Sequence, residues 1–386
     1  MSDKERACAV LKITSETCTA ALKALRDPTT TVQIPEHDAE ASLHTRLTDY
    51  VSLLSLLYQN STKLAIALKP SSLAYSAAIS VAKDLATQAD ALASCAWSIN
   101  DAVHGRTLVR EIRWTAEDVL SALTSLLEVY TSDTHDQGSG EASEAGDPYL
   151  YRTGVVHDAI DRGREISRTN RDAVKKRWDG VVGGMSDCEK EVQEMVEEEE
   201  HDCDNEGDHA NPADSDEDDE WEQFSGASRG NTRASPEELA RLKAVHTLFK
   251  FIHALVERVD LIILRPSSRV TPPPKTLDKL LSSAEMLLKA SDDLVHALYI
   301  PQTPAAVASR SKNLMVLVDE IRSEVLPVGL VTDSQGDNDA ITHLSQQTAS
   351  ASLNLDSRHN ELTMSKERRW FDTCFGQIFK TAATLD

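Results

Sequence analysis

Apolar residues recur every three or four positions over long stretches of the chain, the spacing of one face of an α-helix. Four stripes stand out. The clearest runs from Leu277 to Leu298, and the others lie within 43–64, 109–130 and 242–262. Short alternating runs rich in Val, Ile, Thr and aromatic residues, which would indicate β-strands, do not occur. The pattern therefore predicts an all-α protein.

Proline and glycine divide these stripes into separate helices, because proline is costly inside a helix and tolerated in its first turn. Ser235-Pro236-Glu237-Glu238 combines an N-cap serine, a first-turn proline and a glutamate three residues after the cap. Arg265-Pro266 ends that helix, and Ile300-Pro301 ends the leucine-rich one. We expect helices over ten ranges: 4–26, 36–68, 71–103, 106–131, 148–164, 168–200, 236–264, 275–299, 303–325 and 362–384.

The formal net charge of −23 is concentrated in one segment. Residues 187–222 contain 19 Asp and Glu and one Lys, and so dense a block of like charge repels itself and tends to stay disordered.

Long helices joined by short loops favour antiparallel bundles. We expect an N-terminal helical-bundle domain over 1–200, an acidic disordered linker over 201–234 and a C-terminal helical-bundle domain over 235–386. Its polar stretch 329–360 is expected to be a flexible loop.

Several features predict a soluble intracellular protein. The six cysteines include no CxxC pair, which argues against a disulfide framework or a zinc ribbon and for reduced thiols. The N-terminus carries charges where a signal peptide needs an apolar run, and the densest apolar stretch, 51–57, is much shorter than a membrane span. Because phosphate recognition needs a basic surface, we expect no nucleic acid as partner. Because no apolar stretch is long enough to span a bilayer, we expect no membrane.

No enzyme signature is found: the chain contains no GxGxxG, GxxxxGK[ST], HExxH or GxSxG motif. Gly183-Gly184 lies inside a helical pattern without a preceding strand, unlike a phosphate-binding loop. His201, Cys203 and His209 carry metal-ligand side chains, but a structural metal site needs a fixed four-ligand cage, and we interpret them as chance neighbours. We expect no enzyme activity, no catalytic residue, no metal and no cofactor.

The acidic segment has two interpretations, a flexible tether between bundles or a phosphate-like surface for basic proteins, and we favour the tether. Ser215 within it precedes Asp216-Glu217-Asp218, the context of a casein-kinase-type phosphosite. Phosphate there would add about −1.5 to −2 charge. Ser215 is therefore a candidate phosphosite.

A basic stripe is a second electrostatic candidate, because four residues recur at i, i+4, i+7 and i+11 and would stack on a continuous helix: Arg164, Arg168, Arg171 and Lys175. A solvated helix face is the ordinary interpretation. The sharper hypothesis is that the acidic linker folds back on this stripe and masks it from polyanions or an acidic partner.

Four stretches of the chain follow one another in an order that is typical of one protein family. They are RTLVREI at 106–112 running into DVLSALTSLLEV at 118–129, TNRDAVKKRW at 169–178 leading into EKEVQEMVEE at 189–198, LDKLLSSAEMLLKASDDLVHALYIP at 277–301, and Trp370 opening a last amphipathic helix. In this the chain resembles the cyclin-D1-binding protein 1-like (cyclin-D-interacting protein) family, from about residue 45 to 384. It departs from that family in its N-terminal helix and in the insertion at 329–360.

The resemblance implies an all-α protein with two bundle domains similar to vinculin-type bundles. It also implies a non-enzymatic adaptor of the nucleus and cytoplasm that regulates cell-cycle progression and transcription by binding regulatory proteins, such as cyclins or transcription factors. We expect most leucine stripes to form bundle cores, with a groove left open to partner helices. The alternative is a vinculin-like cytoskeletal or adhesion scaffold, which a basic patch near the last helix would favour.

Overall fold

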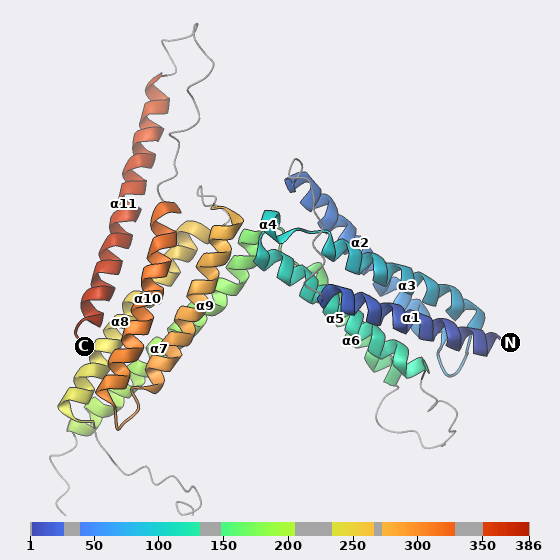
Figure 1. Ribbon diagram of the computed structural model, residues 1–386, viewed down its shortest axis with the longest axis horizontal. Coiled ribbons are helices and arrows are strands. Elements are labelled where there is room, and N and C mark those ends of the chain that lie inside the picture. The colour runs from blue at the N-terminus through green and yellow to red at the C-terminus, as the bar shows by residue number, and fades with distance from the viewer. Residues whose placement is uncertain are drawn as a thin grey trace, which may run out of the picture. The chain divides into compact units, whose positions relative to one another are not determined.

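The computed structural model describes residues 2–26, 39–131, 148–204, 234–265, 272–328 and 350–385. All regular secondary structure in these ranges is helical, and the chain divides into two compact units, Met1–Val174 and Lys175–Asp386 (Figure 1). The prediction of an all-α protein with two helical domains is confirmed.

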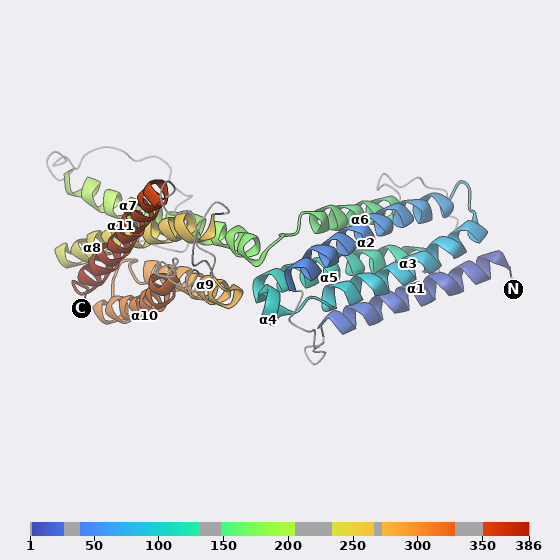
Figure 2. The ribbon, with the colours of Figure 1, turned by 90° about the horizontal axis from the view of Figure 1, so that it is seen from above.

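The N-terminal unit is a bundle of long helices that run side by side (Figure 2). Helix α3 packs against α1, α2 and α5, and α6 closes the bundle by packing against both α2 and α5. Its helices are α1 (Asp3–Arg26), α2 (Ala39–Ala67), α3 (Tyr75–Trp97), α4 (Asp101–His104), α5 (Arg106–Thr131) and α6 (Pro148–Arg164).

A face of small residues on α3 lets its neighbours approach closely. Ala78, Ala82 and Ala89 are fully buried there. Thr14 on α1 donates a hydrogen bond from Oγ1 to the Ala82 carbonyl at 3.0 Å, which ties the two helices together in the core. Because the chain has few aromatic residues, its core is built mainly from Leu, Val, Ile and Ala.

The expected helix over 71–103 is interrupted at 98–100, and the physical reason is a local cap. Asn100 accepts a hydrogen bond from the Ala102 backbone N–H at 2.9 Å, which begins the short helix α4. Gly105 ends α4 with φ of +95°, a conformation that favours glycine. The expected helices over 106–131 and 148–164 are confirmed at both ends.

In the C-terminal unit α9 packs against α10, α10 against α11, and α11 against α8. Most of α7 lies in this unit: Trp178 Nε1 donates to the Val256 carbonyl of α8 at 3.0 Å, and a Cβ on Gly184 would lie 2.7 Å from Leu288 of α9. The elements are α7 (Asn170–Asp204), α8 (Pro236–Val259), the π-helical turn η4 (Asp260–Leu264), α9 (Pro274–His296), α10 (Pro304–Val328) and α11 (Ser350–Ala382).

The structure differs from the expected domain bounds in two places. The division lies at Val174, inside α7, and not near residue 200, because α7 packs against α8 and α9 from Trp178 onward. Helix α11 begins at Ser350, so the stretch 350–360 is helical and not a loop. The polar composition of that stretch suggested a loop, although no Pro or Gly interrupts it.

Residues 205–233 and 329–349, which hold most of the expected linker and loop, lie outside the described residues.

The helix start at Ser235 is confirmed: Ser235 accepts from the Glu238 N–H, and the Glu238 carboxylate accepts from the Ser235 N–H. That reciprocal pair of hydrogen bonds is the capping box that the sequence predicts.

Replacing Trp178 by Phe should destabilise the C-terminal unit by about 1–3 kcal/mol, because it removes the buried hydrogen bond from the indole to the Val256 carbonyl and removes packed atoms. Urea unfolding followed by far-UV circular dichroism measures the effect. Trp114→Phe is the matched control, since Trp114 is 62% exposed, and should change stability by less than about 0.5 kcal/mol. Equal small effects would contradict the packing of α7 described here.

Candidate protein-interaction surfaces

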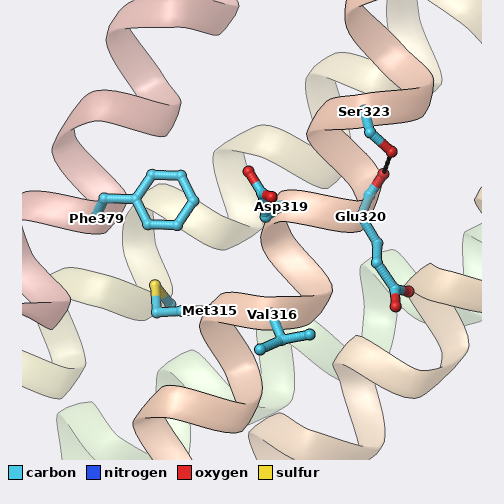
Figure 3. Close-up of a pocket in the computed structure, with 6 residues that line it drawn as sticks. All are labelled: Met315, Val316, Asp319, Glu320, Ser323 and Phe379. Carbon is cyan, nitrogen blue, oxygen red and sulfur yellow. Dashed lines mark hydrogen bonds between the residues drawn. The ribbon is translucent and has the colours of Figure 1, made fainter.

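An open groove of about 450 Å³ lies along α10 beside the C-terminal part of α11 (Figure 3). Five consecutive apolar residues, 314–318, run through this part of α10. A helix in a bundle buries one apolar stripe, and five consecutive apolar residues extend beyond such a stripe. Two of them, Met315 and Val316, line the groove. The groove is lined by Met315, Val316, Asp319, Glu320 and Ser323 of α10 and by Phe379 of α11.

The apolar part of the groove is open to solvent. Val316 is 60% exposed, and Met315 and Phe379 are half-buried, whereas Leu314 and Val318 on the opposite side of α10 are fully buried. Val316 therefore contributes little to the core of the unit. Apolar residues clustered beside polar ones on a surface are typical of protein contacts.

The rim of the groove is acidic. Asp319 is exposed, with its carboxylate 4.0 Å from Arg322 Nη1, the outer limit of an ion pair. The Glu320 carboxylate accepts a hydrogen bond from Ser283 Oγ of α9 at 3.1 Å, which restricts its position. An apolar floor with carboxylates beside it suits a ligand that presents an apolar side chain next to Lys or Arg.

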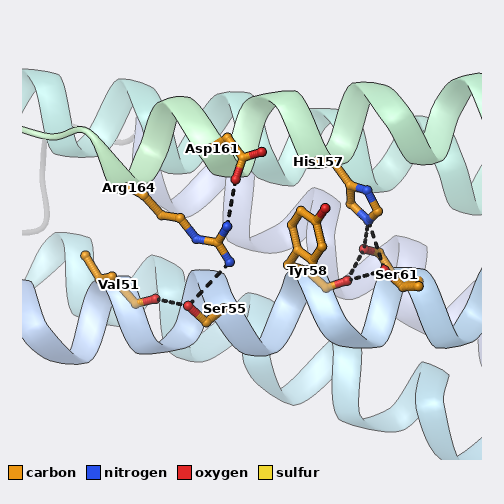
Figure 4. A network of polar contacts seen from close by, with 8 residues as sticks. Val51, Ser55, Tyr58, Ser61, His157, Asp161 and Arg164 are labelled. Atoms are coloured by element: carbon orange, nitrogen blue, oxygen red, sulfur yellow. Dashed lines mark hydrogen bonds and ion pairs between the residues drawn. The ribbon is translucent and has the colours of Figure 1, made fainter.

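A polar network joins α2 and α6 in the N-terminal unit (Figure 4). The His157 ring stacks on Tyr58, with ring centroids 3.8 Å apart, and the Arg164 guanidinium carbon lies 4.9 Å from the centroid of the same Tyr58 ring. His157 Nε2 lies 3.3 Å from Ser61 Oγ and 3.1 Å from Thr62 Oγ1. Arg164 also pairs with Asp161 at 2.7 Å.

The network contains Ser, His and Asp side chains, but its geometry is structural. Ser61 is fully buried and donates its hydroxyl hydrogen to the Tyr58 carbonyl at 2.9 Å, so the serine is not poised to attack a substrate. Asp161 binds Arg164 and so does not orient the imidazole. Burial lowers the pKa of His157 below its ordinary value, which keeps the ring neutral between the two helices.

The structure does not place the four residues of the predicted basic stripe on one continuous helix. Arg164 is the last residue of α6, Arg168 is exposed in the connection before α7, and Arg171 lies in the first turn of α7. Lys175 belongs to the C-terminal unit and pairs with Asp179 and Asp260. The interruption coincides with a capping box that begins α7: the Asp172 N–H donates to Thr169 Oγ1 at 3.2 Å, and the Asp172 carboxylate accepts from the Thr169 N–H at 3.1 Å.

Ser215, His209 and the Cys203 side chain lie outside the described residues, and His201 is exposed on α7. Among the described side chains, no cluster of His, Cys, Asp or Glu is arranged to hold a metal ion. None of the helices searched over the described ranges is long and apolar enough to span a bilayer.

With two helical units and an open apolar groove on one of them, the chain has the features of an all-α protein that binds other proteins. The comparison with protein families agrees with this class. The model "Grap2 and cyclin-D-interacting, N-terminal" matches residues 49–198, and "Grap2 and cyclin-D-interacting, C-terminal" matches 214–323. The chain belongs to the Grap2 and cyclin-D-interacting protein family, as the resemblance in its sequence implied. The search of curated proteins gave no match.

Acidification should weaken the N-terminal unit through His157. A histidine whose pKa is lowered on folding contributes stability that is fully present above the ordinary pKa of about 6.5 and is lost as pH falls below it. The urea midpoint should therefore fall between pH 7.5 and pH 5.5, and it should fall less in His157→Gln.

His104 and His246 also have lowered pKa values and remain in the variant, so the difference between the two proteins isolates His157. The matched control, His44→Gln, changes an exposed histidine of α2 and should leave the pH dependence of the parent chain intact. An identical pH dependence in His157→Gln and the parent chain would show that the imidazole is not held neutral by this network.

Proposed function

We propose that this chain is a non-enzymatic adaptor that regulates cell-cycle progression and transcription by binding regulatory proteins through its helices. Membership of a family described as Grap2- and cyclin-D-interacting supports protein binding as the function. Cyclin-like proteins and transcription factors are the proposed partners, and the nucleus and cytoplasm are the proposed locations. The observation that carries the proposal is the α10–α11 groove, where exposed apolar side chains meet carboxylates.

In this proposal a partner helix lays its apolar face on the groove. An aromatic or aliphatic side chain would cover Val316 and Phe379, and a fully buried side chain of that size contributes about 1.5–3 kcal/mol. A Lys or Arg one turn away on the partner helix would reach Asp319. A few such contacts dominate the affinity of most protein interfaces.

The alternative of a cytoskeletal or adhesion scaffold has weaker support. A basic patch near the last helix would favour this alternative, and two of the basic residues at this helix already contact carboxylates of α11. Arg368 lies 3.9 Å from Asp372, and Arg258 makes an ion pair with Glu367 at 2.5 Å. Affinity capture at native level separates the two functions. Recovery of actin and adhesion proteins without cell-cycle or transcription factors would contradict the adaptor proposal.

Val316→Asp should reduce the amount of each groove-bound partner recovered by affinity capture by about tenfold or more, because it places a charge where an apolar side chain docks. The fold should be unaffected, since Val316 is 60% exposed. Ile66→Asp is the matched control, because Ile66 is 67% exposed on α2. Quantitative mass spectrometry of the captured proteins gives the ratio, and equal recovery with both variants would exclude the groove as the partner site.

A further inference from the structure

The first turns of α5 present a basic and aromatic face to solvent. Arg106, Arg110 and Trp114 recur at i, i+4 and i+8, and all three are exposed, Trp114 to 62%. Leu108 and Ile112 on the other side of the helix are fully buried in the core. Trp114 therefore does not belong to the bundle core, and its large apolar surface lies between charged residues.

The end of α6 and the connection to α7 run along these same turns of α5. Its path is fixed at two points: a Cβ on Gly163 would lie 3.0 Å from Thr115, and Asn170 Oδ1 accepts a hydrogen bond from the Leu108 N–H at 3.0 Å. Arg168, which is exposed, lies between these points. The connection therefore places the guanidinium group of Arg168 near the first turns of α5.

The carboxylates next to Trp114 are already engaged. Asp118, one turn after Trp114, pairs with Arg162 at 2.5 Å, and Glu117 pairs with Arg26 of α1 at 3.1 Å. Glu165 is exposed on the connection and lowers the positive charge. Three exposed guanidinium groups, those of Arg106, Arg110 and Arg168, lie along this part of the unit. We call this surface the α5 face and define it as Arg106, Arg110, Trp114, Arg162 and Arg168.

We propose that the α5 face binds an acidic peptide segment of a partner protein, and that the segment carries an aromatic or large aliphatic side chain. Guanidinium groups bind carboxylates through paired hydrogen bonds, and tryptophan and arginine are the residue types that dominate binding energy at interfaces. Charge complementarity selects an acidic ligand, and the exposed Trp114 indole selects one with an apolar side chain to cover it.

A peptide fits this surface better than a nucleic acid. The exposed residues on α5 span eight positions, about 12 Å of helix, which is a short track for a phosphate backbone. The proposal deepens the proposed adaptor function by naming a class of partner. The face lies in the N-terminal unit, so it does not require that the α10–α11 groove binds anything.

The chain itself supplies a suitable probe sequence. Residues 211–224 contain seven Asp and Glu together with Trp221 and Phe224. A fluorescein-labelled peptide of this sequence would be titrated with two proteins: the full chain, and a full-length variant in which 205–224 is replaced by Gly and Ser. Fluorescence anisotropy at 50 and 150 mM salt gives the affinities.

The variant without its own acidic segment should bind the peptide, more weakly at the higher salt concentration. In that background, Arg110→Glu and Trp114→Ala should each weaken binding by about fivefold or more. Lys12→Glu on α1 is the control for Arg110→Glu, because it makes the same charge reversal at an exposed site. Tyr151→Ala on α6 is the control for Trp114→Ala, because it removes an aromatic side chain that is 68% exposed. Both should stay within about twofold of the parent variant. Weaker binding by the unmodified chain would add support, as its own segment then competes for the face.

Three outcomes would overturn the proposal. One is no binding by the variant without the segment at 50 mM salt, and another is an equal loss of affinity with Lys12→Glu and Arg110→Glu. The third is tighter, Arg110-dependent binding of a single-stranded oligothymidylate of the same charge, which would assign the face to nucleic acid. Val316→Asp should leave the peptide affinity unchanged. If the peptide fails to bind while the groove still captures partners, the adaptor function stands without this face.

Discussion

Burial of one apolar stripe per helix is the constraint on which the rest of this structure depends. With few aromatic residues available, the N-terminal unit achieves close packing through the alanine face of α3. The C-terminal unit places its fully buried indole, Trp178, between α7 and α8, with the Nε1–H bonded to a backbone carbonyl. Once these stripes are buried, apolar side chains left outside them, such as Val316 and Trp114, become the informative features of the surface.

The acidity of the chain is a property of one segment and says little about what the helical units bind. The described surfaces differ in charge: carboxylates border the α10–α11 groove, and exposed arginines share the outer face of α5 with Trp114. An adaptor with two such surfaces could engage ligands of opposite charge without either surface competing for the other's ligand. The partly buried network around His157 belongs to neither surface and joins α2 to α6.

Much of the fold could be predicted from the sequence, because helical periodicity and capping are local. The bounds of α5 and α6 and the capping box at Ser235 follow from residues close in the chain. The break at Asn100 was missed because an asparagine cap competes with helix continuation without any Pro or Gly before Gly105. The start of α11 was missed because polar composition outweighed the absence of helix breakers.

The candidate surfaces were harder to predict, because they depend on which helices meet. The apolar run 314–318 was a usable signal for the groove, yet only the packing of α11 places Phe379 beside it. The stripe from Arg164 to Lys175 assumed one helix, and the cap formed by Thr169 and Asp172 starts a new helix within it. Arg168 instead lies near the first turns of α5, through the contact between Asn170 and Leu108. Such placements are tertiary, and no local pattern encodes them.

Hydrogen exchange on the full chain, alone and with a partner recovered by affinity capture, tests the central claim most directly. The account predicts that the bound partner slows exchange in peptides covering α10 around Val316 and α11 around Phe379. Slower exchange confined to α1 and α3, with α10 unchanged, would contradict the assignment of the groove as the site where this family member binds its partners.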